Sequence, residues 1–239
     1  MVWVGVFFAV AVASAAQALS GFGFALIATP LVAVLVGPKE AVVGLTIVGP
    51  VLTTQLWLRD RGSVDRDATG VITVAALLGM PLGILVLTRA DERTLTALIA
   101  IAVIAFALLL GRGLRVPARR STDAVAGFTA GVLATSTGTS GPPIVIALSA
   151  KEMAPTAFRS TISVIFLIQS GVALLAFALA QQFDVDAVLV ALAGLPGVIL
   201  GAMVGERGFR RLDAQAFRRV VLAMLLLSGK VALVGALVS

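Results

Sequence analysis

The stretch Ala134–Leu148, ATSTGTSGPPIVIAL, interrupts a strongly apolar chain with small polar residues. Its centre holds threonines, serines, glycines and two adjacent prolines, and it carries no charge. Proline lacks an N–H, and glycine adopts conformations that other residues avoid, so we expect a helix to break here. Inside a membrane a break of this kind is tolerated only where protein or water surrounds it. The stretch therefore predicts a buried polar turn.

The composition predicts an all-α, polytopic inner-membrane protein. Of the 239 residues, 59% are hydrophobic and only 13% are charged, with a mean hydropathy of +1.10. Soluble domains carry about twice that charged fraction. Apolar runs such as residues 95–110 and 220–238 approach the roughly 20 residues that cross a bilayer. Since the basic residues lie between apolar segments, the net charge of +6 indicates membrane topology and no nucleic-acid partner.

The chain has neither cysteine nor histidine, which removes thiol nucleophiles and the commonest metal ligands. We therefore expect no metal and no cofactor. An intramembrane enzyme would need a paired acid and base. Ser140 with Lys230 is the only conceivable dyad, and nothing in the sequence places the two together, so we expect no enzymatic activity. The apolar N-terminal residues 2–18 resemble a signal peptide, but nothing basic precedes them, so we expect this segment to remain as the first helix.

Two pairs of segments repeat at nearly the same spacing. ALLGMPLGILV at residues 76–86 aligns with ALAGLPGVILG at residues 191–201, and SGFGFALIATP at residues 20–30 falls on TGTSGPPIVIA at residues 137–147. The chain thus divides into a first repeat (1–112), a cytoplasmic basic linker (113–122) and a second repeat (123–239). Each repeat has a broken hairpin followed by three longer helices. The predicted elements are hairpin 2–36 with helices 40–58, 69–88 and 94–111, then hairpin 124–150 with helices 155–181, 186–204 and 217–238.

The predicted arms are residues 2–16 and 25–36 in the first hairpin and residues 124–135 and 143–150 in the second. At 1.5 Å per residue they reach only roughly 10–23 Å, and the hydrocarbon core is about 30 Å thick. Each hairpin is therefore expected to be re-entrant. A hairpin plus three crossings changes sides an odd number of times, so the second repeat should be inverted.

The charges agree with an inverted arrangement. One side of the membrane would hold fourteen basic residues: Arg59, Arg61, Arg66, Arg112, Arg115, Arg119, Arg120, Lys151, Arg159, Arg207, Arg210, Arg211, Arg218 and Arg219. The other side would hold three, Lys39, Arg89 and Arg93. Basic residues favour the cytoplasmic side, so we expect both termini to lie on the outer side of the membrane. We expect the membrane to be the inner membrane of a bacterium.

Inverted hairpins bring their tips together near the midplane, where many secondary transporters bind substrate. Helix N-termini there would offer N–H groups to an anion without a buried cation. The candidate substrate-binding residues are Gln17, Ser20, Gly21, Phe22, Gly23 and Phe24 at the first tip, and Thr137, Gly138, Thr139, Ser140, Gly141 and Pro142 at the second. Gln169, in the middle of a predicted helix, either contacts the ligand or bonds a neighbouring helix. Pro81 and Pro196 are expected to form related kinks that flank the site.

Two cations have alternative interpretations. Arg159 begins the longest helix of the second repeat and either attracts anions to the entrance or marks the cytoplasmic side. Lys230 lies within a predicted span, where a charge suggests a function, but it is close enough to the C-terminus to snorkel to the interface.

The chain resembles the TauE/SafE family of sulfite exporter-like membrane proteins over nearly its whole length. The features that carry the resemblance are the two Gly-rich hairpins, AFRST at residues 157–161, GLPGVILG at residues 194–201 and the basic pair before VVLAMLLLSGKVALV. The hairpins depart from the family's GxGGG-like run, since they read GFGF and GTSG. The resemblance implies transport, usually outward, of a small sulfur-containing anion such as sulfite, a sulfonate or thiosulfate.

The leading hypothesis is therefore a transporter whose partners are that anion and membrane lipids. The alternatives are an anion channel or facilitator for another substrate, and a membrane subunit that transports nothing. The sequence carries no indication of the oligomeric state.

Overall fold

The structure is a computed structural model that describes residues 1–60, 64–112, 116–151 and 153–209, and all regular secondary structure in these ranges is helical. In chain order the helices are α1 (Val2–Ser20), α2 (Phe24–Val36), α3 (Pro38–Asp60), α4 (Arg66–Arg89), α5 (Glu92–Gly111), α6 (Arg120–Ser136), α7 (Gly141–Ser149), α8 (Pro155–Leu179) and α9 (Val185–Phe209). Five of them, α1, α3, α4, α8 and α9, are long and apolar enough to cross a membrane. The all-α, multi-pass class is confirmed, and the predicted helix 217–238 lies outside the described residues.

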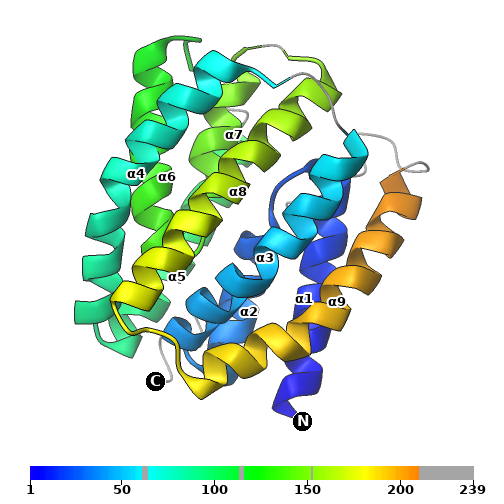
Figure 1. The fold of residues 1–239 in the computed structure, drawn as a ribbon, viewed down its shortest axis with the longest axis vertical. Coiled ribbons are helices and arrows are strands. Elements are labelled where there is room, and N and C mark those ends of the chain that lie inside the picture. Colours follow the sequence, from blue (N-terminus) through cyan, green and yellow to red (C-terminus); the bar gives the residue numbers. More distant parts are fainter. Residues whose placement is uncertain (61–63, 113–115, 152, 210–239) are drawn as a thin grey trace.

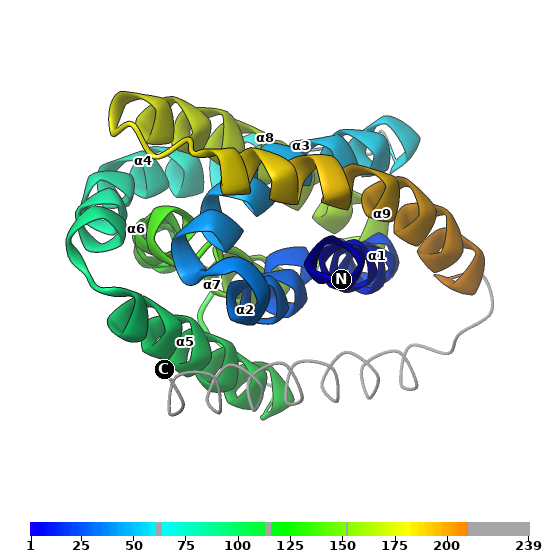
Figure 2. The same ribbon diagram turned by 90° about the horizontal axis from the view of Figure 1, so that it is seen from below.

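The two broken hairpins occupy the middle of the molecule. Figure 2 shows α1–α2 and α6–α7 between α3, α4, α8 and α9 on one side and α5 on the other. The first arm of each hairpin packs along a helix of the other half of the chain, α1 along α9 and α6 along α4 (Figure 1). Segments far apart in the sequence are therefore neighbours throughout the fold.

Glycines allow these two helix pairs to touch backbone to backbone. A Cβ on Gly131 of α6 would overlap the carbonyl oxygen of Ala76 on α4, and a Cβ on Gly201 of α9 would overlap that of Ala11 on α1. Small residues at membrane helix contacts permit such close approach. The hydrophobic effect does not drive helices together inside a bilayer, so van der Waals packing stabilises these contacts instead.

The helix ends differ from prediction where local hydrogen bonds extend them. We predicted that the first arm ends at Ala16, but α1 continues to Ser20, whose hydroxyl lies 2.9 Å from the carbonyl oxygen of Ala16. Gly21 then closes the helix in the left-handed conformation, with φ of 84°. At 19 residues α1 is about 28 Å long. The re-entrant path of the first hairpin stays a prediction.

The second hairpin also begins earlier than predicted. Its first arm, α6, starts at Arg120, so the last residues of the predicted linker 113–122 are helical. Its second arm, α7, starts at Gly141 with Pro142 and Pro143 in its first turn, as the double proline indicated. The division of the chain into two inverted repeats stays a prediction.

Pro81 and Pro196 lie inside α4 and α9 as predicted. An interior proline removes a helix hydrogen bond and bends the helix. Figures 1 and 2 show that α9 changes direction along its length. Neither proline lines the cavity described below.

An ion pair joins the two open ends of the second hairpin. The Nζ atom of Lys151, just after α7, lies 2.9 Å from Oδ2 of Asp123 in the first turn of α6. The Asp123 side chain is only 1% exposed and that of Lys151 is 18% exposed. Separating the two arms or removing one partner would leave an uncompensated charge in a buried position. The ion pair therefore stabilises the contact between the arms.

We expect Gly131→Leu to lower the free energy of unfolding by at least about 2 kcal/mol, because the side chain forces α4 and α6 apart. Gly70→Leu is the matched control, since a Cβ on Gly70 meets nothing within 4 Å. Thermal unfolding of the purified variants in lipid nanodiscs measures both. Equal stability of the two variants would contradict the close α4–α6 contact.

We expect Lys151→Met to destabilise the protein by roughly 3 kcal/mol, because it leaves Asp123 buried and unpaired. The double variant Asp123→Leu/Lys151→Met removes both charges and should regain most of that loss. The same unfolding measurement compares the three proteins. A double variant as unstable as the single one would show that the charge of Asp123 is not the cause.

Candidate functional site

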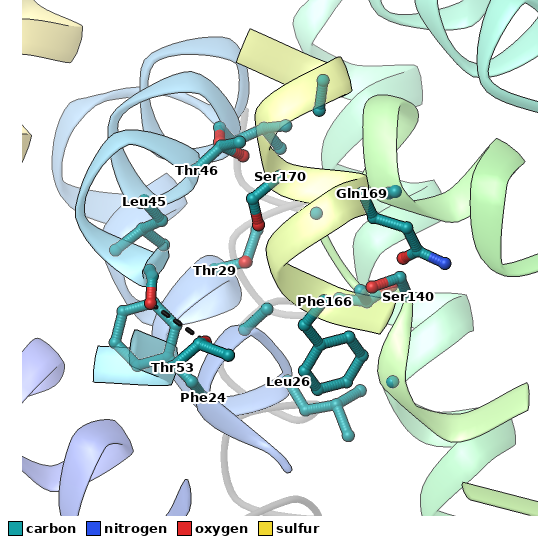
Figure 3. Close-up of a pocket in the computed structure, with 18 of the residues that line it drawn as sticks. Phe24, Leu26, Thr29, Leu45, Thr46, Thr53, Ser140, Phe166, Gln169 and Ser170 are labelled. Atoms are coloured by element: carbon teal, nitrogen blue, oxygen red, sulfur yellow. Dashed lines mark hydrogen bonds between the residues drawn. The ribbon is translucent and has the colours of Figure 1, made fainter. Parts of the chain in front are cut away.

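A cavity of about 80 Å³ lies where the breaks of the two hairpins meet α3 and α8. A buried water needs roughly 10–15 Å³ on the same scale, so the cavity has room for several waters or one small ion. Figure 3 shows Phe24 and Thr29 of α2 on one side, Ser140 and Gln169 on the other, and Leu26 of α2 beneath the ring of Phe166.

Gln17 holds the first break together. The amide of Phe24, the first residue of α2, donates to Oε1 of Gln17 at 3.2 Å. The Nε2 atom of Gln17 donates to Oγ1 of Thr53 on α3 at 3.4 Å. The Gln17 side chain therefore supplies the acceptor that the start of α2 lacks and fixes the tip against α3.

The first break also presents unpaired donors to the cavity. Gly23, with φ of 103°, is the N-cap of α2, and Ala25 and Leu26 follow in its first turn and line the cavity. First-turn amides have no partner within a helix, so the N–H groups of Ala25 and Leu26 are available to a ligand.

The second break turns at Gly138, whose φ is 71°. The hydroxyls of Thr137 and Thr139 are hydrogen-bonded to each other at 2.7 Å, which braces the turn. Ser140 is the N-cap of α7 but makes no capping hydrogen bond through its side chain. Since Pro142 and Pro143 lack N–H groups, Gly141 has the only amide among the first three residues of α7, and this helix end is a weaker anion site than expected.

Two buried polar side chains in the lining have no hydrogen-bond partner among the described residues. Gln169 of α8 is 2% exposed, and both its Oε1 and its Nε2 are unpaired. Thr29 of α2 is fully buried with an unpaired Oγ1. Buried polar atoms are almost always satisfied, so these three atoms are free to bond a molecule in the cavity.

Every described residue of the lining is uncharged. The described residues also contain no group of three or more His, Cys, Asp or Glu side chains that could hold a metal ion. The chemistry available in the cavity is therefore hydrogen bonding from amides, hydroxyls and helix N-termini.

The structure brings eight of the thirteen predicted binding residues to the cavity. Those in the lining are Gln17, Gly23, Phe24, Gly138, Thr139, Ser140, Gly141 and Gln169. Those outside it are Ser20, Gly21, Phe22, Thr137 and Pro142. The hydroxyl of Ser20 bonds the backbone at the end of α1, so its position is structural. The contact of any of the thirteen with substrate stays a prediction.

Arg159 lies beside the first tip rather than in the lining. Its Nη2 donates to the carbonyl oxygen of Ala18 at 3.4 Å, near the C-terminus of α1, where a cation is favourable. A Cβ on Gly21 would lie 3.0 Å from Cγ of Arg159, so the Arg159 stem packs over the glycine. Its role in attracting anions stays a prediction, and Lys230 lies outside the described residues.

Apart from Gln169, the lining residues on α3 and α8 were not predicted from the sequence. Thr46, Gly49 and Thr53 line the cavity from α3, and Phe166 and Ser170 line it from α8 with Gln169. Spacings of three and four residues place the three α3 residues on one helix face, and this small, polar face was the available signal.

The fold and site define a multi-pass membrane protein with an uncharged, hydrogen-bonding cavity between two broken hairpins. The chain matches the sequence profile described as sulfite exporter TauE/SafE over residues 6–231, so it belongs to the TauE/SafE family of membrane transporters. Neither a curated relative nor a solved structure matches it.

We expect the two buried glutamines to behave differently when replaced. Gln17→Met leaves the Phe24 amide without an acceptor and should lower the free energy of unfolding by about 1–3 kcal/mol. Gln169→Met removes an amide that has no partner among the described residues, so stability should stay the same or rise. Thermal unfolding without added anions measures both, and an equal loss in the two variants would contradict these roles.

Proposed function

We propose that this protein exports a small sulfur-containing anion, such as sulfite, a sulfonate or thiosulfate, across a bacterial inner membrane. The anion binds in the cavity between the two hairpin tips. The observation that carries the proposal is the pair of unpartnered, buried side chains, Gln169 of α8 and Thr29 of α2, in the lining of the cavity where the two breaks meet. Membership of the TauE/SafE family supports the transport class and the sulfur chemistry.

Neutral groups suit a site that must also release its ligand. A buried arginine at the centre of a membrane helix costs at least about 2.5 kcal/mol and would hold an anion strongly. The amides of Ala25, Leu26 and Gly141 can instead bind the charge through helix N-termini, as broken helices do in other transporters. The site can therefore bind the anion and still release it during transport.

The packing supports the proposal that the halves are inverted repeats. Aligning the ALLGMPLGILV and ALAGLPGVILG segments makes α4 equivalent to α9, and aligning the breaks makes α1 equivalent to α6. Under these alignments, the backbone contact between α4 and α6 in one place corresponds to the backbone contact between α9 and α1 in the other. Such symmetry lets a central site open alternately to the two sides of a membrane. Together with the charge distribution, an inverted repeat supports our prediction that both termini lie outside.

Anion flux in proteoliposomes tests the function directly. Sulfite, thiosulfate, sulfate and a small sulfonate are loaded in turn, and we expect saturable flux of at least one sulfur anion. Gly138→Leu should reduce that flux at least tenfold, because the side chain is strained at a φ of 71° and enters the cavity beside Thr29. Gly171→Leu is the matched control, since Gly171 faces open space on α8.

Thr29→Val provides a variant that should fold normally, because the hydroxyl it removes has no partner among the described residues. It should raise the KM of the transported anion. Flux that never saturates would indicate a channel. Absence of flux for every sulfur anion, with folded protein confirmed, would overturn the proposal, and a stoichiometric copurifying partner would then indicate a non-transport subunit.

A further inference from the structure

The cavity contains hydrogen-bond acceptors as well as donors. The hydroxyl of Thr46 donates to the carbonyl oxygen of Val42 at 2.7 Å, and that of Thr53 donates to Gly49 at 3.1 Å. A hydroxyl has one proton, so both side chains offer only lone pairs to a ligand. Thr53 already accepts from Gln17, which leaves Thr46 as an unpaired acceptor in the lining.

The side chain of Gln169 carries hydrogen-bond donors and an acceptor in one planar group. Its carboxamide offers two N–H donors and one carbonyl acceptor, all buried and without a partner among the described residues. Figure 3 shows this amide beside the Ser140 hydroxyl, on the opposite side of the cavity from Thr29 and Thr46. A ligand that satisfies Gln169 completely must itself have an acceptor next to a donor.

The charged groups of the surrounding helices lie outside the lining. They are the amino terminus before α1, Lys39, Glu40, Arg59 and Asp60 on α3, Arg120 and Asp123 on α6, and Arg159 on α8. Helices α2 and α7 have no charged residues. No described group in the lining titrates, so a pH dependence of binding there must come from the ligand.

A cavity without charged groups favours a monoanion over a dianion. The cost of moving an ion out of water grows with the square of its charge, so a dianion is penalised roughly four times as much as a monoanion of the same size. A fully deprotonated oxyanion is also an acceptor only. It could accept from Nε2 of Gln169 but would leave Oε1 of Gln169 and the Thr46 hydroxyl oxygen unsatisfied.

We propose that the cavity binds the singly charged, O-protonated form of a sulfur oxyanion, of which hydrogensulfite is the simplest, and that Gln169 selects this form. The ligand O–H donates to Oε1 of Gln169, and an adjacent ligand oxygen accepts from Nε2. The amides of Ala25 and Leu26 and the hydroxyl of Thr29 bind the remaining oxygens. This inference rests on the proposed function and narrows its substrate class to monoanions that carry their own proton.

The pH dependence of KM tests the selection. Sulfite and selenite have the same shape, but the second ionisation of selenite lies at higher pH. In proteoliposomes, with protein-free vesicles subtracted, the KM for total sulfite should rise about tenfold per pH unit above its second pKa. The curve for selenite should move to higher pH by the difference between the two second pKa values. A KM that is constant, that falls as pH rises, or that changes at one pH for both anions overturns the inference.

Variants locate the selection in Gln169. Gln169→Met should raise the KM for hydrogensulfite at least tenfold and flatten the pH dependence, because the paired donor and acceptor are lost. Thr29→Val should raise KM but keep the full pH dependence, since it removes only a hydroxyl on the opposite side. An unchanged pH dependence in Gln169→Met would show that another group selects the protonated form.

The two proposals fail in different ways. Saturable flux of sulfur anions without the expected pH dependence would leave the transport function standing and remove the selection of a protonated monoanion. Absence of flux at every pH, for sulfite, selenite, thiosulfate and sulfonate alike, would overturn the transport function itself.

Discussion

A helix that breaks in an apolar interior leaves backbone groups without partners, and the rest of this structure depends on how that need is met. At the first break, Gly21 and Ser20 complete the end of α1, and the side chain of Gln17 provides an acceptor for the start of α2. The same glutamine is anchored to Thr53 of α3. One side chain thus satisfies the break and fixes its position, so the remaining amides of α2 can face a cavity instead of packed protein.

Close helix contacts provide the space in which this happens. Gly131 and Gly201 bring α6 against α4 and α1 against α9 at backbone distance, and the hairpins lie in the middle of the fold as a result. The two breaks then meet across a cavity that no single helix could form. Its polarity follows from this geometry, because hydroxyls and amides that serve the breaks also line the space between them.

The sequence predicted what depends on local composition. Glycine and proline identified both breaks, and apolar runs identified the long helices to within a few residues. The extension of α1 to Ser20 was missed because a side chain bonds the backbone of the preceding turn. Thr46 and Ser170 were missed because threonines and serines are common in apolar helices, and only tertiary packing decides which of them face a cavity. The strength of the α7 N-terminus was overestimated, since the two prolines that mark the break also remove its donors.

The pairing of α1 with α9 has a consequence for how the protein is made. Val2–Ser20 is synthesised well before its packing partner, Val185–Phe209, which follows most of the described chain. The surface of α1 that contacts Gly201 must therefore remain exposed to lipid or to a chaperone until α9 is inserted. Contacts so distant in sequence slow folding and lengthen the time in which incomplete chains can associate wrongly. Assembly of this fold is thus a late event of synthesis, and a chain that stops before α9 leaves the α9-facing surface of its first helix uncovered.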